Sequence, residues 1–252
     1  MQRLKDRIVW VTGAGSGIGR ATALAFAQEG ARVALSGRRV DALTETAAAI
    51  GENAMVVPAD LSDPTQVDQA HGLIASAWGA IDILVNNAGT NAKRRHWREL
   101  STADMTTIMD VNLKAPFLCS LAVLPGMRAR KAGLLIHIAS VAGTMLFPVS
   151  GPAYTATKHG ARAMSATINA EEGIHGIRSV CINPGEVETA ILDSRPKPPS
   201  TAERALLIQP EDIAAAAVFA ALMPPRTCIA DMTILPTDNQ FWRATARSIA
   251  EG

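Results

Sequence analysis

The chain begins with a short apolar run, a glycine-rich turn and an alanine-rich helical pattern, in that order. The run Ile8–Thr12 is rich in β-branched residues and predicts a strand, while the pattern that ends near Glu29 predicts a helix. The turn between them, Gly13–Gly19, lets the backbone pass close to a ligand, and the helix that follows offers it unpaired N–H groups and a positive dipole end. The segment therefore predicts a phosphate-binding loop, with an ordinary glycine-rich surface turn as the alternative.

The same order of strand and helix repeats along the chain. Further strands are predicted at residues 32–35, 54–58, 81–85, 133–138 and 177–182, and further helices at 40–50, 64–78, 101–131, 154–173 and 211–223. Asp63 is the expected N-cap of the helix that Pro64 opens. Strands that alternate with helices at this spacing imply right-handed crossovers and a parallel sheet. With 252 residues, 48% of them hydrophobic, the chain predicts one α/β domain over residues 1–252. Its expected fold is a Rossmann-like, doubly wound parallel sheet of about seven strands with helices on both faces.

Composition and charge narrow the classes of partner and the compartment. The formal net charge is +1 and no basic face runs along the sequence, so nucleic acid and anionic membranes are not expected partners. Cys119, Cys181 and Cys228 are widely spaced in apolar surroundings, which predicts buried, reduced thiols and no metal site. The N-terminus lacks an apolar signal region, and the longest apolar run, Ile213–Met223, is too short to span a membrane. We therefore expect a soluble, cytoplasmic protein with a small-molecule ligand.

The end of the second predicted strand carries two arginines, Arg38 and Arg39, about twenty residues beyond the glycine turn. A dinucleotide-binding fold that prefers NAD usually has an acidic residue there, which holds the ribose 2′-hydroxyl. A guanidinium group instead suits an added 2′-phosphate. The pair predicts a preference for NADP over NAD, with Arg38 as the first candidate; two solvated arginines at the start of a helix are the alternative.

Tyr154 is the only tyrosine in the chain, and Lys158 follows it four residues later. In a helix this spacing places the phenol and the ammonium group on the same face. A cation close to a phenol stabilises the ionised form, so the pair predicts a side chain that can donate and accept a proton. An ordinary pair on a helix surface is the alternative.

Four separated motifs carry a resemblance to a known family. They are Thr12-Gly13-x-x-x-Gly17-Ile18-Gly19, Asn86-Asn87-Ala88-Gly89, Tyr154-x-x-x-Lys158 and Asn183-Pro184-Gly185. In this order and spacing the chain resembles the short-chain dehydrogenase/reductase family, over about residues 5 to 240.

The resemblance implies a catalytic tetrad. Tyr154 would exchange the proton, Ser140 would hydrogen-bond the substrate oxygen, Lys158 would hold the ribose, and Asn112 would hold a water that relays protons. Sequence position places Ser140 just past the predicted strand 133–138 and Asn112 inside the helical stretch 101–131. A turn residue at a strand end and a helix-capping residue are the respective alternatives.

The cofactor expected from these features is NADP(H), with NAD(H) less favoured. Its expected contacts come from the glycine turn, the arginine pair, the ends of the following strands and the segment after Pro184, which the resemblance places beside the nicotinamide. These residues are Gly13, Ser16, Gly17, Ile18, Gly19, Arg38, Arg39, Asp60, Leu61, Asn87, Ala88, Gly89, Tyr154, Lys158, Pro184, Gly185, Val187 and Thr189. The resemblance also implies a homodimer or homotetramer.

Several segments leave alternatives open. Residues 186–208 are the expected substrate loop, and their proline-rich part 193–200 would form a lid or else a plain surface connection. The basic run Lys93–Arg98 could attract an acidic substrate to the cleft mouth, or could be a solvated loop. His137 and His159 flank catalytic residues and are expected to be structural.

The tail departs from the commonest family pattern, which is a glycine-rich ending after the last strand. The segment 232–240 is instead similar to a branch of NADP-dependent hydroxy-acid and serine-type dehydrogenases. This similarity supports NADP and leaves the substrate and the usual C-terminal packing between subunits open.

The function that the resemblance implies is an oxidoreductase that transfers a hydride between NADP(H) and a carbonyl or secondary alcohol. Tyr154, Lys158, Ser140 and Asn112 would carry the reaction. A dehydratase or epimerase that keeps the cofactor, and a non-catalytic NADP-binding regulator, are the rival interpretations. A nucleic-acid module would need a basic stripe that the composition lacks.

Overall fold

A computed structural model describes residues 2–195, 198–238 and 249. In that part of the chain seven strands form one sheet in the order β3-β2-β1-β4-β5-β6-β7, and every neighbouring pair is parallel. The strands are β1 (Ile8–Thr12), β2 (Arg32–Gly37), β3 (Ala54–Pro58), β4 (Ile83–Asn86), β5 (Gly133–Ile138), β6 (Ile177–Pro184) and β7 (Asp231–Ile234). The predicted single-domain, doubly wound α/β fold is confirmed.

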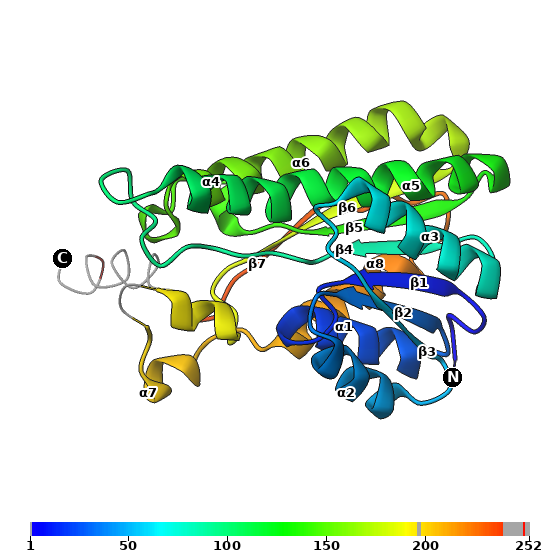
Figure 1. Cartoon of the computed structure of the whole chain (residues 1–252), viewed down its shortest axis with the longest axis horizontal. Coiled ribbons are helices and arrows are strands. Elements are labelled where there is room, and N and C mark those ends of the chain that lie inside the picture. The colour runs from blue at the N-terminus through cyan, green and yellow to red at the C-terminus, as the bar shows by residue number, and fades with distance from the viewer. Residues whose placement is uncertain (1, 196–197, 239–248, 250–252) are drawn as a thin grey trace.

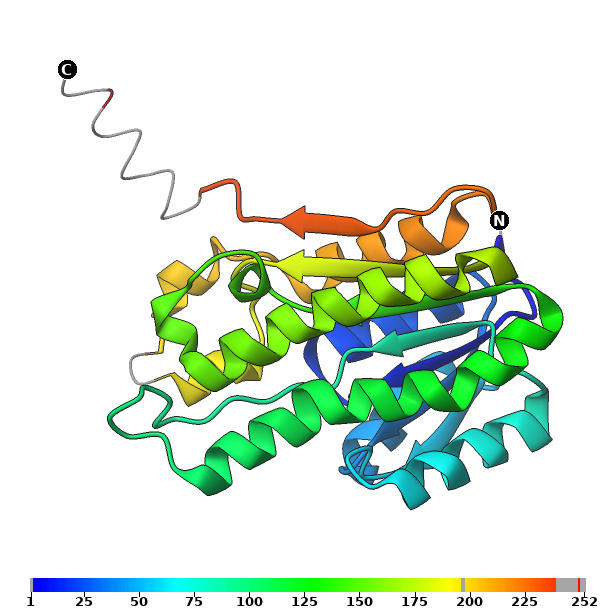
Figure 2. The same ribbon diagram turned by 90° about the horizontal axis from the view of Figure 1, so that it is seen from above.

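Helices cover both faces of the sheet (Figures 1 and 2). One layer contains α1 (Gly17–Gln28), α2 (Val40–Ile50) and α8 (Pro210–Leu222). The other contains α3 (Pro64–Trp78), α4 (Thr102–Met109), α5 (Ala115–Arg130) and α6 (Pro152–Glu172). The short elements are η1 (Asp110–Lys114), η2 (Val141–Gly143), η3 (Pro148–Ser150), η4 (Gly173–His175), η5 (Ala190–Ser194) and α7 (Thr201–Arg204).

The alternation of side chains along β1 shows why both faces need cover. Val9 and Val11 belong to the core on the α1 and α8 side, whereas Ile8 and Trp10 belong to the core on the α3 and α5 side. All four are buried, because a central parallel strand has no solvated face. The polar atom of Trp10 is satisfied inside the core, since its Nε1 donates to Ser36 Oγ at 2.8 Å.

Most predicted elements are confirmed, and the differences have local causes. Helix α3 starts at Pro64 as expected, and the Asp63 carboxylate accepts a hydrogen bond from Thr65 N at 2.9 Å. Strand β4 starts at Ile83, two residues after the predicted start, because the carboxylate of Asp82 accepts a hydrogen bond from the backbone N–H of Ile8 at 2.9 Å. Strand β6 continues to Pro184, which pairs with Ile234 of β7.

The predicted helix over residues 101–131 contains a π-helical turn, η1, between α4 and α5. By length and composition the whole helix Thr102–Arg130 could cross a membrane, but core helices pass the same test. Here its apolar side chains Cys119, Val123 and Met127 pack against the sheet. We therefore interpret it as a core helix of this fold.

Candidate active site

A cavity of about 900 Å³ opens at the carboxyl ends of the parallel strands. This is the edge at which ligands bind in open α/β sheets. Its lining includes Ser140 and nearly all residues that the sequence predicts as cofactor contacts. Those contacts are Gly13, Ser16, Gly17, Ile18, Arg38, Arg39, Asp60, Leu61, Asn87, Ala88, Gly89, Tyr154, Lys158, Pro184, Gly185, Val187 and Thr189.

The glycine turn after β1 leaves no room for side chains. Gly13 has φ +64°, and a Cβ there would lie 2.9 Å from Ala88 Cα. Gly17 has φ +51°, and a Cβ there would lie 3.0 Å from Thr189 Cγ2. Ser16 precedes α1 without capping it through its side chain, so the first turn of this helix meets the cavity with its backbone N–H groups. The turn has the shape and polarity of an anion-binding cradle.

Two predicted site residues, Gly19 and Asn112, do not line the cavity. Gly19 is buried beneath the turn, where a Cβ would lie 2.2 Å from the Gly13 carbonyl oxygen and 2.4 Å from Asn87 Nδ2. It therefore allows α1 to pack closely under the turn, and in the structure its contacts are with protein atoms.

Thr12 joins the glycine turn to the segment after β4. Its Oγ1 donates to the Val85 carbonyl at 3.1 Å and accepts from the N–H groups of Asn87 and Ala88 at 2.9 and 3.0 Å. The Asn87 side chain donates back to the Thr12 carbonyl at 2.9 Å. These bonds fix two parts of the cavity wall to each other.

Positive charge gathers where β2 ends. Arg39 donates through Nη2 to Ser16 Oγ at 3.0 Å, and Arg38 lines the same end of the cavity. The Asp60 carboxylate accepts hydrogen bonds from Ser62 N and Oγ at 3.0 and 2.7 Å. These bonds, and more weakly the charge of Arg38, lower the pKa of Asp60. Asp60 is therefore ionised at neutral pH, close enough to Arg38 for their charges to interact.

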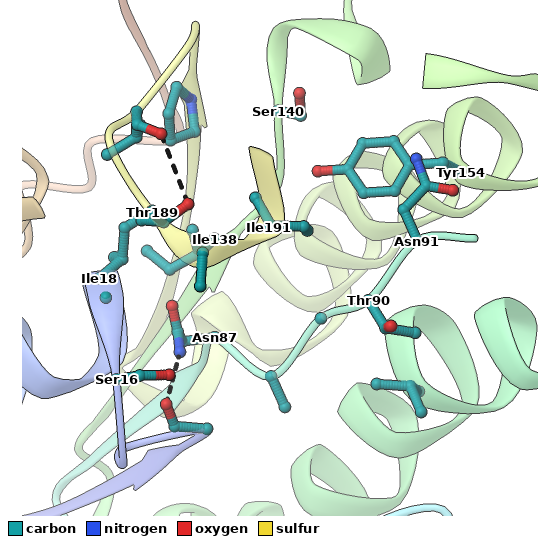
Figure 3. Close-up of a pocket in the computed structure, with 18 of the residues that line it drawn as sticks. Ser16, Ile18, Asn87, Thr90, Asn91, Ile138, Ser140, Tyr154, Thr189 and Ile191 are labelled. Carbon is teal, nitrogen blue, oxygen red and sulfur yellow. Dashed lines mark hydrogen bonds between the residues drawn. The ribbon is translucent and has the colours of Figure 1, made fainter. Parts of the chain in front are cut away.

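Tyr154 lies in the first turn of α6, and its hydroxyl points into the cavity on the side from which Ser140 and Ile191 project (Figure 3). Lys158 is one turn along, with its Nζ 5.4 Å from the centre of the Tyr154 ring. The ammonium group is buried and donates to the carbonyl of Ile138 at 2.8 Å. Helix α6 thus supplies the aromatic hydroxyl and the cation, while the sheet holds the cation in place.

Ser140 follows β5 and begins η2, where its Oγ accepts a hydrogen bond from Ala142 N at 3.1 Å. Its hydroxyl proton can still be donated into the cavity, which Ser140 lines together with Tyr154 (Figure 3). The serine therefore has both the structural role at a strand end and access to a ligand.

Asn112 lies in the π-turn η1 and fastens a neighbouring segment. Its Oδ1 accepts from Thr90 N at 2.8 Å, and its Nδ2 donates to the Thr90 carbonyl at 2.9 Å. A Cβ on Gly89 would lie 3.7 Å from Asn112 Oδ1 and 3.8 Å from Lys158 Nζ. Asn112 is therefore close to the lysine, although it caps no helix.

The sequence prediction missed several residues that complete the wall. Thr90, Asn91, Phe147 and Val149 were not predicted, whereas Ile191, Leu192 and Arg195 lie in the segment 186–208 that was expected to be the substrate loop. Asn91 is tied to the loop before α6, since its Nδ2 donates to the Ser150 carbonyl at 2.9 Å. Their position just after the Asn-Asn-Ala-Gly motif could have indicated Thr90 and Asn91, whereas no sequence signal indicated Phe147 and Val149.

The segment 186–208 has more structure than a plain connection, in its described residues. Arg195 Nη1 and Glu186 Oε1 form an ion pair at 2.5 Å, and Arg204 pairs with Glu188 at 3.0 Å and with Asp193. Ser200 and Glu203 form a capping box that starts α7. Residues 196 and 197 of the expected lid lie outside the described part, as do residues 239 and 240 of the tail.

The remaining expectations concern histidines, cysteines and metals. His137 is buried, and burial together with the charge of Lys158 lowers its pKa to about 3, so it is neutral. Burial raises the pKa of the Cys119 and Cys181 thiols to about 12. The expectation for Cys228 is wrong, because it is exposed in the connection to the edge strand β7. No group of three or more potential metal ligands occurs among the described residues.

Comparisons with known proteins agree with this geometry. A family model described as short chain dehydrogenase matches residues 7–199. An uncharacterised oxidoreductase of Staphylococcus aureus (strain N315) is 32% identical over 237 residues, which cover 94% of this chain and all of that protein.

Two solved structures show the range of cofactors bound by similar proteins. The closed form of a serine dehydrogenase complexed with NADP+ has a TM-score of 0.83 and 30% identity, over 90% of this chain and 94% of that one. A 3-ketoacyl-(acyl-carrier-protein) reductase from Brucella melitensis, complexed with NADH, has a TM-score of 0.85 and 28% identity, over 92% and 97%.

Proposed function

Because this chain belongs to the short-chain dehydrogenase family, we propose that it is an NADP(H)-dependent oxidoreductase that interconverts a carbonyl group and a secondary alcohol. The observation that carries the proposal is the position of Tyr154. Its hydroxyl faces the cavity that the glycine turn also lines, and Lys158 lies one helical turn away. A proton donor and an anion cradle therefore share one cleft.

The residues present fit a dinucleotide. Two features suit a pyrophosphate. Gly13 and Gly17 have positive φ and carry no side chain that would block the anion. The start of α1 has no side-chain cap that would compete with the anion for its N–H groups. The cofactor would supply the hydride that reduces the carbonyl carbon.

The proposed work of the protein is to hold the substrate oxygen and to move one proton. Ser140 donates a hydrogen bond to the oxygen, and Tyr154 delivers its phenol proton as the alcohol forms. Lys158 stabilises the phenolate that remains, because its ammonium group is held in the buried wall by the Ile138 carbonyl. Asn112, through its two bonds to Thr90, keeps the segment beside Lys158 in place and would complete a relay to solvent.

The preference for NADP is part of the proposal. Arg38 and Arg39 lie where β2 ends and line the cavity. The Nη2 of Arg39 donates a hydrogen bond to Ser16 Oγ at 3.0 Å. A 2′-phosphate in this corner would receive charge-assisted hydrogen bonds. Similar proteins bind NADP+ or NADH, so the arginines, and not the family, support the preference.

The proposal also includes a cytoplasmic homo-oligomer with a substrate loop at 186–208. Phe117 and Leu121 are exposed four residues apart on α5, which gives this helix an apolar stripe suited to a second subunit. The ion pairs of Arg195 and Arg204 hold the described parts of the loop beside the cavity.

The direct test is Tyr154→Phe. Loss of the hydroxyl should lower kcat by about a hundred- to ten-thousand-fold, since general acid catalysis contributes that much. Turnover would be followed by NADPH absorbance on a panel of carbonyl compounds, and NADPH binding by fluorescence titration. Binding should be unchanged, because the ring remains. Substantial turnover by the variant would refute the assigned role of Tyr154.

A further inference from the structure

One residue of the basic run Lys93–Arg98 behaves unlike its neighbours. Arg95 is only 4% exposed and lines the cavity, whereas Arg94 and Arg98 are exposed. Its position depends on Gly151, which has φ +76° just before α6. A Cβ on Gly151 would lie 2.4 Å from the Arg95 carbonyl oxygen and 3.0 Å from Arg95 Cβ. The arginine is therefore packed against the start of the helix that carries Tyr154, three residues further on.

Arg95 lines the same cavity as Tyr154 and Arg195. Burial lowers the pKa of Arg95, the neighbouring Arg195 lowers it further, and the ionised phenol of Tyr154 would raise it. The guanidinium groups of Arg95 and Arg195 thus lie close enough for their charges to interact. An anionic ligand that reached this guanidinium group would offset part of the cost of burying its charge.

The carboxylates in the same wall do not exclude an anionic ligand. Glu186 and Glu188 line this end of the cavity, and each is neutralised by an arginine of the substrate loop. Glu186 pairs with Arg195 at 2.5 Å, and Glu188 pairs with Arg204 at 3.0 Å. Their charges therefore cancel within the loop.

Apolar side chains form the rest of this end. Val141, Phe147, Val149, Ile191 and Leu192 line the cavity around Tyr154 and Ser140. A ligand that fits both the buried guanidinium group of Arg95 and these apolar side chains is small, has an apolar chain and carries an anionic group.

We propose that Arg95 binds a carboxylate of the substrate, so that the preferred substrates are hydroxy acids and the corresponding oxo acids. The guanidinium group suits a carboxylate because its planar fork can donate two parallel hydrogen bonds. This assignment rests on the proposed function, and it makes Arg95 the residue that selects the substrate class.

The test compares matched acids and amides. Oxidation of α-hydroxybutanoate, β-hydroxybutanoate and γ-hydroxyvalerate by NADP+ would be measured against the primary amide of each. At least one acid should have a kcat/KM about tenfold or more above that of its amide. Arg95→Met should reduce this acid-to-amide ratio by about ten- to a hundred-fold, and Arg95→Lys should reduce it less, because lysine keeps the charge and loses the fork. Arg94→Met is the matched control and should leave the ratio unchanged. NADPH binding by fluorescence titration should be the same in all variants.

The outcomes separate this inference from the proposed function. If the enzyme oxidises neutral secondary alcohols and every amide as well as its acid, Arg95 does not select carboxylates and the inference is overturned, while the proposed function stands. If Arg95→Met lowers acid and amide equally, the arginine acts through Tyr154 and the inference is likewise overturned. If NADPH binds but no alcohol or carbonyl in the panel reacts, the proposed function itself fails. Should Arg95→Met not fold by circular dichroism, the acid-to-amide ratios of the unmodified protein and of Arg95→Lys decide.

Discussion

The two ends of the cavity are built in different ways. The end at which we propose cofactor binding, the cofactor end, is shaped largely by backbone: the glycine turn and the start of α1, fixed by the hydrogen bonds of Thr12 and Asn87, leave gaps too small for a Cβ at Gly13 and Gly19. The substrate end is made of side chains from loops that are distant in sequence, and ion pairs hold its described loop residues.

The difference separates what the fold must keep from what it can change. In the proposed function, backbone at the cofactor end would meet a part of the ligand that is the same in every dinucleotide, so a fixed shape would suffice. Side chains at the substrate end can be exchanged without moving a strand, because they stand on loops. Substitutions at the two ends should therefore change different quantities. At the cofactor end we expect changes in stability and cofactor affinity, and at the substrate end a change in the substrate KM.

The largest effect is expected from Gly19→Ala. The added methyl group would lie 2.2 Å from the Gly13 carbonyl oxygen, so α1 must shift from the turn. We expect a loss of about 3 kcal/mol in the free energy of unfolding by urea, with weaker NADPH binding. Gly72→Ala on α3 is the matched control, since no atom lies within 4 Å of a Cβ there. Unchanged stability in Gly19→Ala would break the claim that backbone fit defines this end.

Arg38→Asp tests a side-chain feature of the cofactor end. Loss of a charge-assisted hydrogen bond, with repulsion added, should shift the ratio of kcat/KM for NADPH over NADH by about ten- to a hundred-fold toward NADH. Arg32→Asp, at the other end of the same strand, should leave the ratio unchanged. The assignment of Arg38 is lost if both variants keep the original cofactor preference.

His137 is buried in β5, near Lys158, and its environment predicts a pH effect on stability. Its pKa is about 3 when folded, below the ordinary value of 6.5, so the unfolded chain takes up the proton first as the pH falls. The contribution of neutral His137 to the free energy of unfolding is therefore fully present above pH 6.5. It is lost as the pH falls toward 3, by up to about 1.4 kcal/mol per pH unit.

His137→Leu should remove this contribution. Urea unfolding at pH 7.5 and 5.5 would show a loss of stability about 1 kcal/mol smaller than in the unmodified protein. His159→Leu, which alters an exposed histidine, is the control. An equal loss in the His137 variant and the unmodified protein would show that His137 is not the responsible group.

The smallest effect is expected from Arg204→Met in the substrate loop. Its pairs with Glu188 and Asp193 are partly solvated, so their loss should raise the substrate KM by only about two- to fivefold. The Kd for NADPH should not change. Arg226→Met, in the exposed connection after α8, serves for comparison. A weakened Kd for NADPH in Arg204→Met would show that the two ends are coupled.

Much of the fold could be predicted because its boundaries have local causes. Helix α2 (Val40–Ile50) ends where Gly51 takes a positive φ, and α3 begins where Asp63 and Pro64 supply a cap and a fixed φ. The capping box of Ser200 and Glu203 is also readable in the sequence, although the segment was predicted only as a substrate loop. Such signals act within a few residues, so no knowledge of the partners is needed.

The rest could not be predicted because it depends on packing between distant segments. The burial of Arg95 depends on Gly151, and nothing in the run Lys93–Arg98 distinguishes this arginine from its neighbours. Phe147 and Ile191 join the cavity wall from different loops. The cofactor motifs were recognisable because glycines without room for a Cβ leave a pattern in the sequence, whereas at the substrate end only the segments 186–208 and Lys93–Arg98 were indicated, without their individual contacts.

The π-turn η1 restricts how the gene can change in length. Each residue in a helix advances the side chains by about 100°, so removing one residue from Asp110–Lys114 would turn α4 against α5 by that angle. Either Asn112 would swing away from Thr90, or the stripe of Cys119 and Val123 would leave the core. Substitutions can accumulate along this helix, but deletion of a single codon within the turn would disrupt either the site around Asn112 or the packing of the core.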